Sequence, residues 1–211
     1  MDKTNRNIFL IGGGEIAKKE TIEVDRVFLK EMGGAGSAKL LFFPTAANDS
    51  EGYIRVFSEY FSALGCNNIE SAKLNSEPEE KIKEKIDRAN VIYLGGGSTK
   101  FLIDTFREKN IVEFLNIFVK EKKVLVGMSA GACALGGIAL ISEIEEDLQL
   151  EEGWNILPEA IILPHYKKDY QDTLDQIKAY YPQKYVFGIP EGSAVHIKNA
   201  RVKFVGKVVE K

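Results

Sequence analysis

Six short, nearly continuous apolar runs recur along this chain, separated by segments with helical periodicity. They cover residues 8–11, 40–43, 91–94, 124–126, 160–163 and 186–189. Apolar runs without an alternating polar face are typical of strands that helices cover on both sides, as in parallel sheets. The pattern therefore predicts an α/β fold built on a single, doubly wound, mainly parallel sheet.

The segments between these runs predict the helices. Apolar residues at helical spacing indicate helices at about 17–32, 52–64, 79–88, 99–106, 110–121 and 169–181. Residues 194–197 and 202–205 flank a polar turn and predict a C-terminal β-hairpin. No linker, repeat or low-complexity segment divides the sequence, so residues 1–211 are expected to form one domain.

The composition disfavours several classes of protein. A net charge of −3 with scattered basic residues leaves no basic patch for nucleic acid or an acidic membrane. Cys66 and Cys133 are too few for a disulfide framework or a zinc cluster. Residues 1–7 are polar, without the pattern of a signal peptide, and no apolar run is long enough to cross a bilayer. We therefore expect a cytoplasmic protein, as a monomer or homodimer.

The segment Gly-Met-Ser-Ala-Gly at 127–131 directly follows the fourth apolar run. A buried strand, a sharp turn of small residues and a helix at about 130–140 would present the hydroxyl of Ser129 at the strand end. The helix would also place unpaired N–H groups and the positive end of its dipole beside that hydroxyl. A glycine-rich turn without chemistry is the alternative, but the flanking strand and helix favour a nucleophilic serine.

A serine nucleophile needs a base, and commonly a carboxylate that orients the base. The chain has two histidines. His165 follows the fifth apolar run and is expected at the same sheet edge as Ser129, whereas His196 lies inside the predicted hairpin. Glu191 follows the sixth run and is the favoured orienting acid, with Asp147 and its acidic neighbours as the alternative.

Two glycine triplets follow the first and third apolar runs. Gly97 closes the second triplet, where missing side chains let the backbone approach a ligand, so the N–H groups of Gly97 and Ala130 are the candidate oxyanion donors. The first triplet, at 12–14, fits the dinucleotide-binding pattern G-x-G-x-x-G only with Ala17 in the last position. No acidic residue ends the second run and no Walker lysine follows either triplet, so nucleotide binding is disfavoured.

At these positions the sequence resembles peptidase family S51, which includes dipeptidase E and cyanophycinase. Four segments carry the resemblance, in order: Tyr-Leu-Gly-Gly-Gly-Ser-Thr at 93–99, Gly-Met-Ser-Ala-Gly-Ala at 127–132, Leu-Pro-His-Tyr at 163–166 and Gly-Ile-Pro-Glu-Gly at 188–192. It implies a flavodoxin-like fold related to the class I glutamine amidotransferases. It also implies a serine peptidase that requires no metal and no cofactor and acts on short peptides.

The resemblance assigns roles to five residues. It makes Ser129 the nucleophile, His165 the base and Glu191 the orienting acid, with oxyanion donors at Gly97 and Ala130. The chain order Ser, His, Glu differs from the order Ser, acid, His of the α/β-hydrolases. The order Ser, His, Glu is that of family S51, so it disfavours membership of the α/β-hydrolases.

The sequence departs from the family where the substrate would be recognised. By resemblance, the dipeptidase carries an arginine after its histidine that binds an aspartyl carboxylate, but no arginine occurs here between Arg107 and Arg201. Lys167 and Lys168 are the candidate substitutes, although lysine lacks the bidentate fork of arginine. Dipeptides with an N-terminal Asp are therefore one expected substrate class, and strict specificity for them is in doubt.

A protein without efficient catalysis is the alternative to an enzyme. It would be a weak or inactive amidotransferase-like protein that binds or regulates. A working amidotransferase is disfavoured because the turn carries serine rather than cysteine. Cys133 lies one helical turn beyond Ser129 and is expected to be a small buried core residue.

Overall fold

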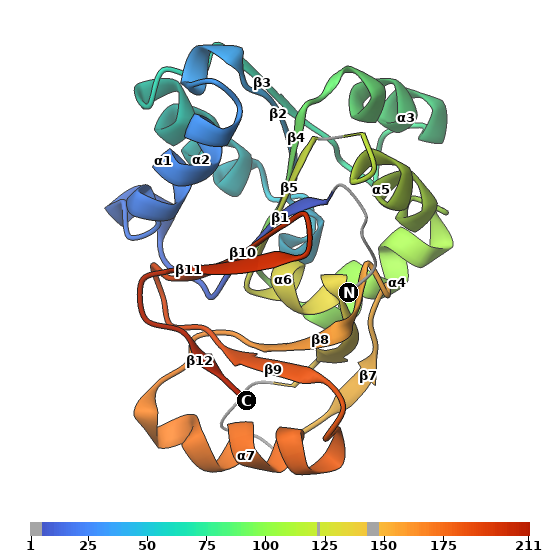
Figure 1. The fold of residues 1–211 in the computed structure, drawn as a ribbon. Helices are drawn as coiled ribbons and strands as arrows, with labels where there is room; N and C mark the ends of the chain where they lie inside the picture. Colours follow the sequence, from blue (N-terminus) through green and yellow to red (C-terminus); the bar gives the residue numbers. More distant parts are fainter. Residues whose placement is uncertain (1–5, 122, 143–147) are drawn as a thin grey trace.

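The computed structural model describes residues 6–121, 123–142 and 148–211, and a seven-stranded sheet forms its centre (Figure 1). The strand order is β11-β10-β1-β5-β4-β2-β3. These strands are β1 (Asn7–Ile11), β2 (Lys39–Phe43), β3 (Asn68–Ser71), β4 (Val91–Leu94), β5 (Val124–Met128), β10 (Ala194–Lys198) and β11 (Arg201–Val205). The neighbouring strands β1, β5, β4, β2 and β3 pair in parallel. Strand β10 pairs antiparallel with β1, and β11 pairs antiparallel with β10.

Helices cover this sheet on both faces, which explains the continuous apolar runs. Helices α1 (Ile22–Glu31) and α2 (Glu51–Ala63) lie on one side, and α3 (Glu79–Arg88), α4 (Thr99–Glu108) and α5 (Val112–Phe118) on the other (Figure 1). Successive residues of each strand point to opposite faces. Phe9 and Phe42 therefore pack with α1 and α2, whereas Ile8 and Leu41 pack with the opposite helices.

A second sheet corrects the prediction of a single sheet. Its order is β12-β9-β8-β6-β7. Its strands are β6 (Gly136–Leu140), β7 (Leu150–Glu152), β8 (Leu157–Leu163), β9 (Tyr185–Gly188) and β12 (Val209–Glu210), and α7 (Gln171–Tyr180) covers its outer face (Figure 1). The helix predicted at 130–140 stops early, because α6 (Ala130–Leu135) ends at Gly136 and the chain continues as β6. Strand β6 pairs in parallel with β8, and β8 pairs in parallel with β9. The fifth and sixth apolar runs, which form β8 and β9, therefore belong to the second sheet and not to the central one.

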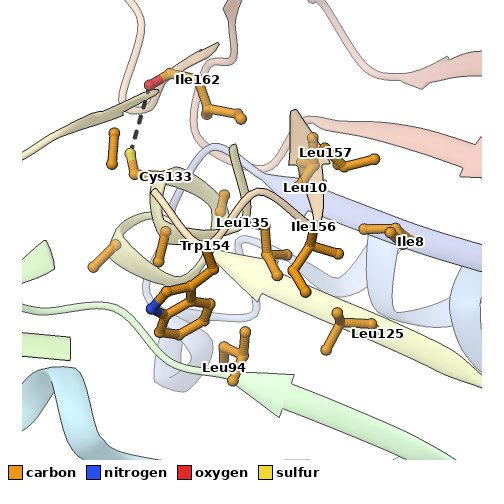
Figure 2. Packing of buried hydrophobic residues seen from close by; sticks show 14 of the residues in the cluster. Ile8, Leu10, Leu94, Leu125, Cys133, Leu135, Trp154, Ile156, Leu157 and Ile162 are labelled. Atoms are coloured by element: carbon orange, nitrogen blue, oxygen red, sulfur yellow. Dashed lines mark hydrogen bonds between the residues drawn. The ribbon is translucent and has the colours of Figure 1, made fainter. Parts of the chain in front are cut away.

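Helix α6 fills the space between the two sheets. All six of its residues are buried, and five of them are alanine, glycine or cysteine. Figure 2 shows Cys133 and Leu135 of this helix in one cluster with Leu10 of the central sheet and Ile162 of the second. The Cys133 thiol donates weakly to the carbonyl of Ile162 at 3.5 Å, and burial raises its pKa to about 12. Cys133 is thus a buried core residue, as predicted.

Most other helices begin and end close to their predicted positions, but the helix predicted at 17–32 starts later, since Ile16–Lys18 form a separate 3-10 turn and α1 begins at Ile22. The strands that the sequence did not reveal are β3, β6, β7 and β12. Three of them, β3, β7 and β12, are edge strands whose residues are largely half-buried or exposed, so they lack an apolar run. No helix in the described part of the chain has the length and apolar character needed to cross a membrane.

A buried carboxyl lies under the central sheet. Asp25 of α1 accepts hydrogen bonds at Oδ2 from Thr21 Oγ1 and Tyr60 Oη, each at 2.7 Å, and its Oδ1 has no partner among the described residues. Burial raises the pKa of this carboxyl to about 6, in spite of the two hydrogen bonds. Burial lowers the pKa of His196 to about 4, so acidification affects the two groups with opposite signs.

The Asp25→Asn variant is expected to lose an acid-side stabilisation that the natural protein has. A carboxyl whose pKa is higher in the folded than in the unfolded state binds protons on folding, so it stabilises the fold as pH falls through 6. Between pH 7 and pH 5 the stability difference between the two proteins should shift by on the order of 1 kcal/mol in favour of the natural one. Urea unfolding at both pH values measures it, and a difference independent of pH would contradict the prediction.

Candidate active site

Ser129 lies at a strained turn between β5 and α6. Its backbone has φ 51° and ψ −110°, a conformation that costs a non-glycine residue on the order of 1–3 kcal/mol. The turn is possible because Gly131 lets α6 pack directly on β4: a Cβ there would lie 2.5 Å from the carbonyl oxygen of Leu94. The Ser129 N–H continues the ladder with β1 by donating to Ile11 O at 2.9 Å, so the strained residue is anchored by its backbone.

Ser129, His165 and Glu191 form one continuous chain of hydrogen bonds. Ser129 Oγ lies 2.8 Å from His165 Nε2, and His165 Nδ1 lies 3.0 Å from Glu191 Oε1. A carboxylate only accepts, so Nδ1 carries the proton and donates to Glu191, while Nε2 accepts from the serine hydroxyl. The arrangement has the base and the orienting acid in the order that serine activation requires.

The three side chains come from both sheets. Ser129 follows β5 of the central sheet, whereas His165 follows β8 and Glu191 follows β9 of the second. His165 also has a positive φ, of 50°. The prediction placed all three at one sheet edge, but the structure assembles them where the strand ends of two sheets meet.

The first glycine triplet joins the strand ends of the two sheets. The carbonyl of Gly12 accepts from His165 N–H at 2.8 Å, and the carbonyl of Gly13 accepts from Gly192 N–H at 3.0 Å. Gly13 has φ 142°, and a Cβ there would lie 2.3 Å from Cε1 and 2.5 Å from Nδ1 of His165. The triplet therefore leaves room for the imidazole. The comparison with the dinucleotide-binding pattern did not indicate this role.

Within the described ranges, no hydrogen bond is found for the backbone N–H groups of Gly97, which lines the cavity, and Ala130, which follows Ser129. The neighbouring donors are engaged: Ser98 N–H donates to Ala46 O at 2.8 Å, and Gly96 N–H donates to Tyr53 Oη at 3.4 Å. Gly96 lies beside the nucleophile, since a Cβ on it would be 3.4 Å from Ser129 Cβ. The N–H groups of Gly97 and Ala130 are therefore available to a ligand bound beside Ser129.

Tyr53 of α2 contacts the second glycine triplet through its hydroxyl, and no pattern in the sequence singles this residue out. Its ring meets Phe42 edge-on, with the ring centres 4.9 Å apart, and burial raises the pKa of its hydroxyl to about 12. The phenol therefore stays protonated at neutral pH. In the sequence Tyr53 is one of several aromatic residues on an amphipathic helix, so only the fold distinguishes it.

A cavity of about 370 Å³ opens beside Ser129 and His165. Its wall combines small polar and apolar residues from α4, α6, β6 and the segment after β8. The lining residues are Gly97, Ser98, Thr99, Ser129, Cys133, Leu140, Ile141, Ser142, Pro164 and His165. A cavity of this size fits a small-molecule ligand.

The remaining candidates lie elsewhere. Lys167 and Lys168 are exposed and do not line the cavity, and the Lys167 ammonium sits 5.7 Å from the ring centre of Tyr170. His196 of β10 lies away from Ser129. Its ring stacks on Phe9 of β1, and its Nε2 lies 2.8 Å from Asn7 Oδ1. Asp147, the alternative orienting acid, lies outside the described residues. Over the described ranges, no group of three or more His, Cys, Asp or Glu side chains could hold a metal ion.

Comparisons with known proteins identify the family of this chain. The family model described as Peptidase family S51 matches residues 8–205. Peptidase E of Nostoc sp. is 24% identical over 215 residues, which cover 96% of this chain and 86% of that protein. The Uncharacterized peptidase YgaJ of Bacillus subtilis is 30% identical over 122 residues, 57% of this chain and about half (52%) of that protein.

Solved structures show the same fold. A putative Peptidase E protein from Listeria monocytogenes EGD-e superposes with a TM-score of 0.68 at 21% identity, covering 98% of each chain. A peptidase from an acI-B1 Actinobacterium gives a TM-score of 0.69, also at 21% identity, over 99% of this chain and 98% of that one. The family match covers most of the sequence and confirms the resemblance drawn from the strand-end motifs: the chain belongs to peptidase family S51.

Proposed function

We propose that this member of the peptidase family hydrolyses short peptides with Ser129 as nucleophile, through an acyl-enzyme. The observation that carries the proposal is the unbroken hydrogen-bond chain from Ser129 Oγ through His165 to Glu191, at the wall of a ligand-sized cavity. The family match and the Peptidase E relatives support the reaction class. A small peptide is the proposed partner of the site.

The acylation step follows from the geometry. Ser129 Oγ forms a bond to the scissile carbonyl carbon while its proton moves to His165 Nε2. The carbonyl oxygen becomes an oxyanion beside the N–H groups of Gly97 and Ala130. The imidazolium then gives its proton to the leaving nitrogen, the C–N bond breaks, and the amine departs.

Deacylation reverses the proton transfers with water. His165 Nε2 takes a proton from water, whose oxygen adds to the acyl carbon. The second tetrahedral intermediate breaks its bond to Ser129 Oγ, and His165 returns the proton to the serine. Throughout, Glu191 keeps the Nδ1 proton in place, so Nε2 remains the nitrogen that faces the serine.

Labelling with a fluorophosphonate probe tests this function without knowledge of the substrate. An activated serine forms a phosphoryl-serine bond with loss of fluoride, and mass spectrometry of the digested protein locates it. We expect labelling at Ser129 and none in Ser129→Ala, while Ser98→Ala, which removes another hydroxyl of the cavity, still labels. A natural protein that stays unlabelled would instead support a binding or regulatory role.

Replacing Gly13 by alanine is expected to lower kcat/KM by roughly 100-fold or more, because small displacements of catalytic groups have effects of this size. The new Cβ would occupy the space of the His165 ring and would also require an unfavourable φ of 142°. Steady-state kinetics on any cleaved peptide and the labelling rate measure the effect.

Gly36→Ala is the matched control. A Cβ at Gly36 would have open space around it, and no unfavourable φ opposes the change. This variant should keep both activity and stability. Full activity in Gly13→Ala would show that His165 can function from another position.

A further inference from the structure

Among the described residues, the wall of the cavity beside Ser129 has no lysine, arginine, aspartate or glutamate. Apart from Ser129 and His165, its side chains are the hydroxyls of Ser98, Thr99 and Ser142 and the apolar groups of Cys133, Leu140, Ile141 and Pro164. The hydroxyls of Ser98 and Ser142 accept from backbone N–H groups of Phe101 and Gln149, at 3.2 and 3.1 Å. Their own protons are left to donate to a polar but neutral group.

Two cations of α4, the helix whose N-terminus borders this wall, are already engaged. Lys100, next to Thr99, lies 3.0 Å from Asp104 and 3.0 Å from Glu151. The Arg107 guanidinium, two turns further along α4, donates to the carbonyls of Glu152 and Gly153. Neither is free to neutralise an acidic side chain in the cavity.

The local charges also disfavour an acidic side chain. Glu191 places a carboxylate behind His165, 3.0 Å from its ring. A carboxylate that leaves water for a neutral wall loses hydration without gaining a cation, which disfavours the charged form. The N-terminus of α4 is the favourable element, but its effect is modest, is screened by salt and reaches only about one turn.

We propose that the cavity beside Ser129 accepts an uncharged substrate side chain and discriminates against aspartyl and glutamyl residues. This specificity rests on the proposed peptidase function and names its substrate class. The hydroxyls of Ser98, Thr99 and Ser142 would bind a neutral polar side chain, such as an amide, and Leu140, Ile141 and Pro164 would pack against its carbons. The volume of about 370 Å³ suits a ligand no larger than a short peptide.

Isosteric dipeptide pairs test the proposal with the natural protein. Each pair differs by one charge, Asn against Asp or Gln against Glu, placed first in the N-terminal and then in the C-terminal position beside leucine. The peptide termini are the same within a pair, so the ratio of kcat/KM isolates the side-chain charge. We expect the amide member to be favoured by at least about tenfold in one of the two positions, a ratio that corresponds to about 1.4 kcal/mol.

A charge introduced into the wall should invert this preference. Thr99→Arg adds a cation to the cavity, and Thr99→Gln provides a long neutral side chain as the matched control. Relative to Thr99→Gln, the arginine variant should shift the Asp to Asn ratio by at least about tenfold toward Asp. An unchanged ratio would show that the substrate side chain lies away from this wall and would overturn the proposal.

The outcomes separate the two proposals. In one outcome, Ser129→Ala is inactive but the natural protein prefers Asp or Glu peptides, or cleaves charged and neutral peptides equally. This outcome supports the serine peptidase and overturns the proposal of a cavity for uncharged side chains. Peptide hydrolysis that persists in Ser129→Ala, or a Ser129 that neither labels nor cleaves, overturns the proposed function itself.

Discussion

The Ser129→Ala variant is expected to lose roughly 10⁴-fold or more in kcat, because the attacking atom is gone and only binding and the oxyanion donors remain. The fold should survive, since the backbone of residue 129 is held by hydrogen bonds to Ile11 O and from Cys133 N–H that do not involve the side chain. Steady-state kinetics and thermal unfolding of the same preparation measure the two effects.

The interpretation depends on separating activity from stability. A midpoint of thermal unfolding within a few degrees of the natural protein, with kcat near the detection limit, is the result that we expect. Gly36→Ala, which leaves Ser129 and the cavity wall unchanged, undergoes the same assay as the active control. Retention of full peptidase activity by Ser129→Ala would refute nucleophilic catalysis by this residue.

The Glu191→Gln variant is expected to show the second largest loss, of about 100-fold or more in kcat, because an amide can donate to Nδ1 and thereby favour the wrong tautomer of His165. The loss should be smaller than for a buried orienting acid. The Glu191 side chain is 55% exposed and that of His165 41%, so water screens their interaction and can take part of its role. The measurement is kcat at saturating substrate, with KM expected to change little.

A neighbouring carboxylate serves as the control. Glu20 belongs to the loop that packs against Gly192, and its Oε2 accepts from Glu15 N–H at 2.7 Å. Glu20→Gln keeps an acceptor for that bond and removes a similar charge near the site, so it should change kcat by less than a few-fold. Equal losses of kcat in Glu191→Gln and Glu20→Gln would mean that negative charge near the site sets the rate and that the contact between Glu191 and His165 does not.

The candidate site was easier to predict from the sequence than the arrangement of the strands. Ser129, His165 and Glu191 each follow a buried apolar run, and the ends of parallel strands are where such folds place ligands. That rule holds in each sheet separately, so the residues could be selected although the second sheet was not foreseen. The hydrogen bonds that join them depend on how the sheets meet, which no run of residues displays.

The error in the fold has a definite origin. Residues 130–140 are small or apolar throughout and show neither helical nor alternating periodicity, so a helix and a helix followed by a strand look alike. Gly136 and Gly137 mark the change, but Gly127 and Gly131 lie inside β5 and α6, so glycine alone does not mark a boundary here. The roles of Gly13 and Tyr53 were equally hidden, because each depends on a neighbour that is distant in the sequence.

Helix α6 also acts as a spacer that sets the reach of the catalytic groups. One buried helix of small residues separates the sheet that carries the nucleophile from the sheet that carries the base. Its side-chain volume therefore contributes to the spacing of the two sheets, across which Ser129 Oγ and His165 Nε2 lie 2.8 Å apart. A methyl group added to this helix could move the two halves of the site apart without touching either one. The rate of substrate turnover is therefore expected to depend on the spacing between the two sheets.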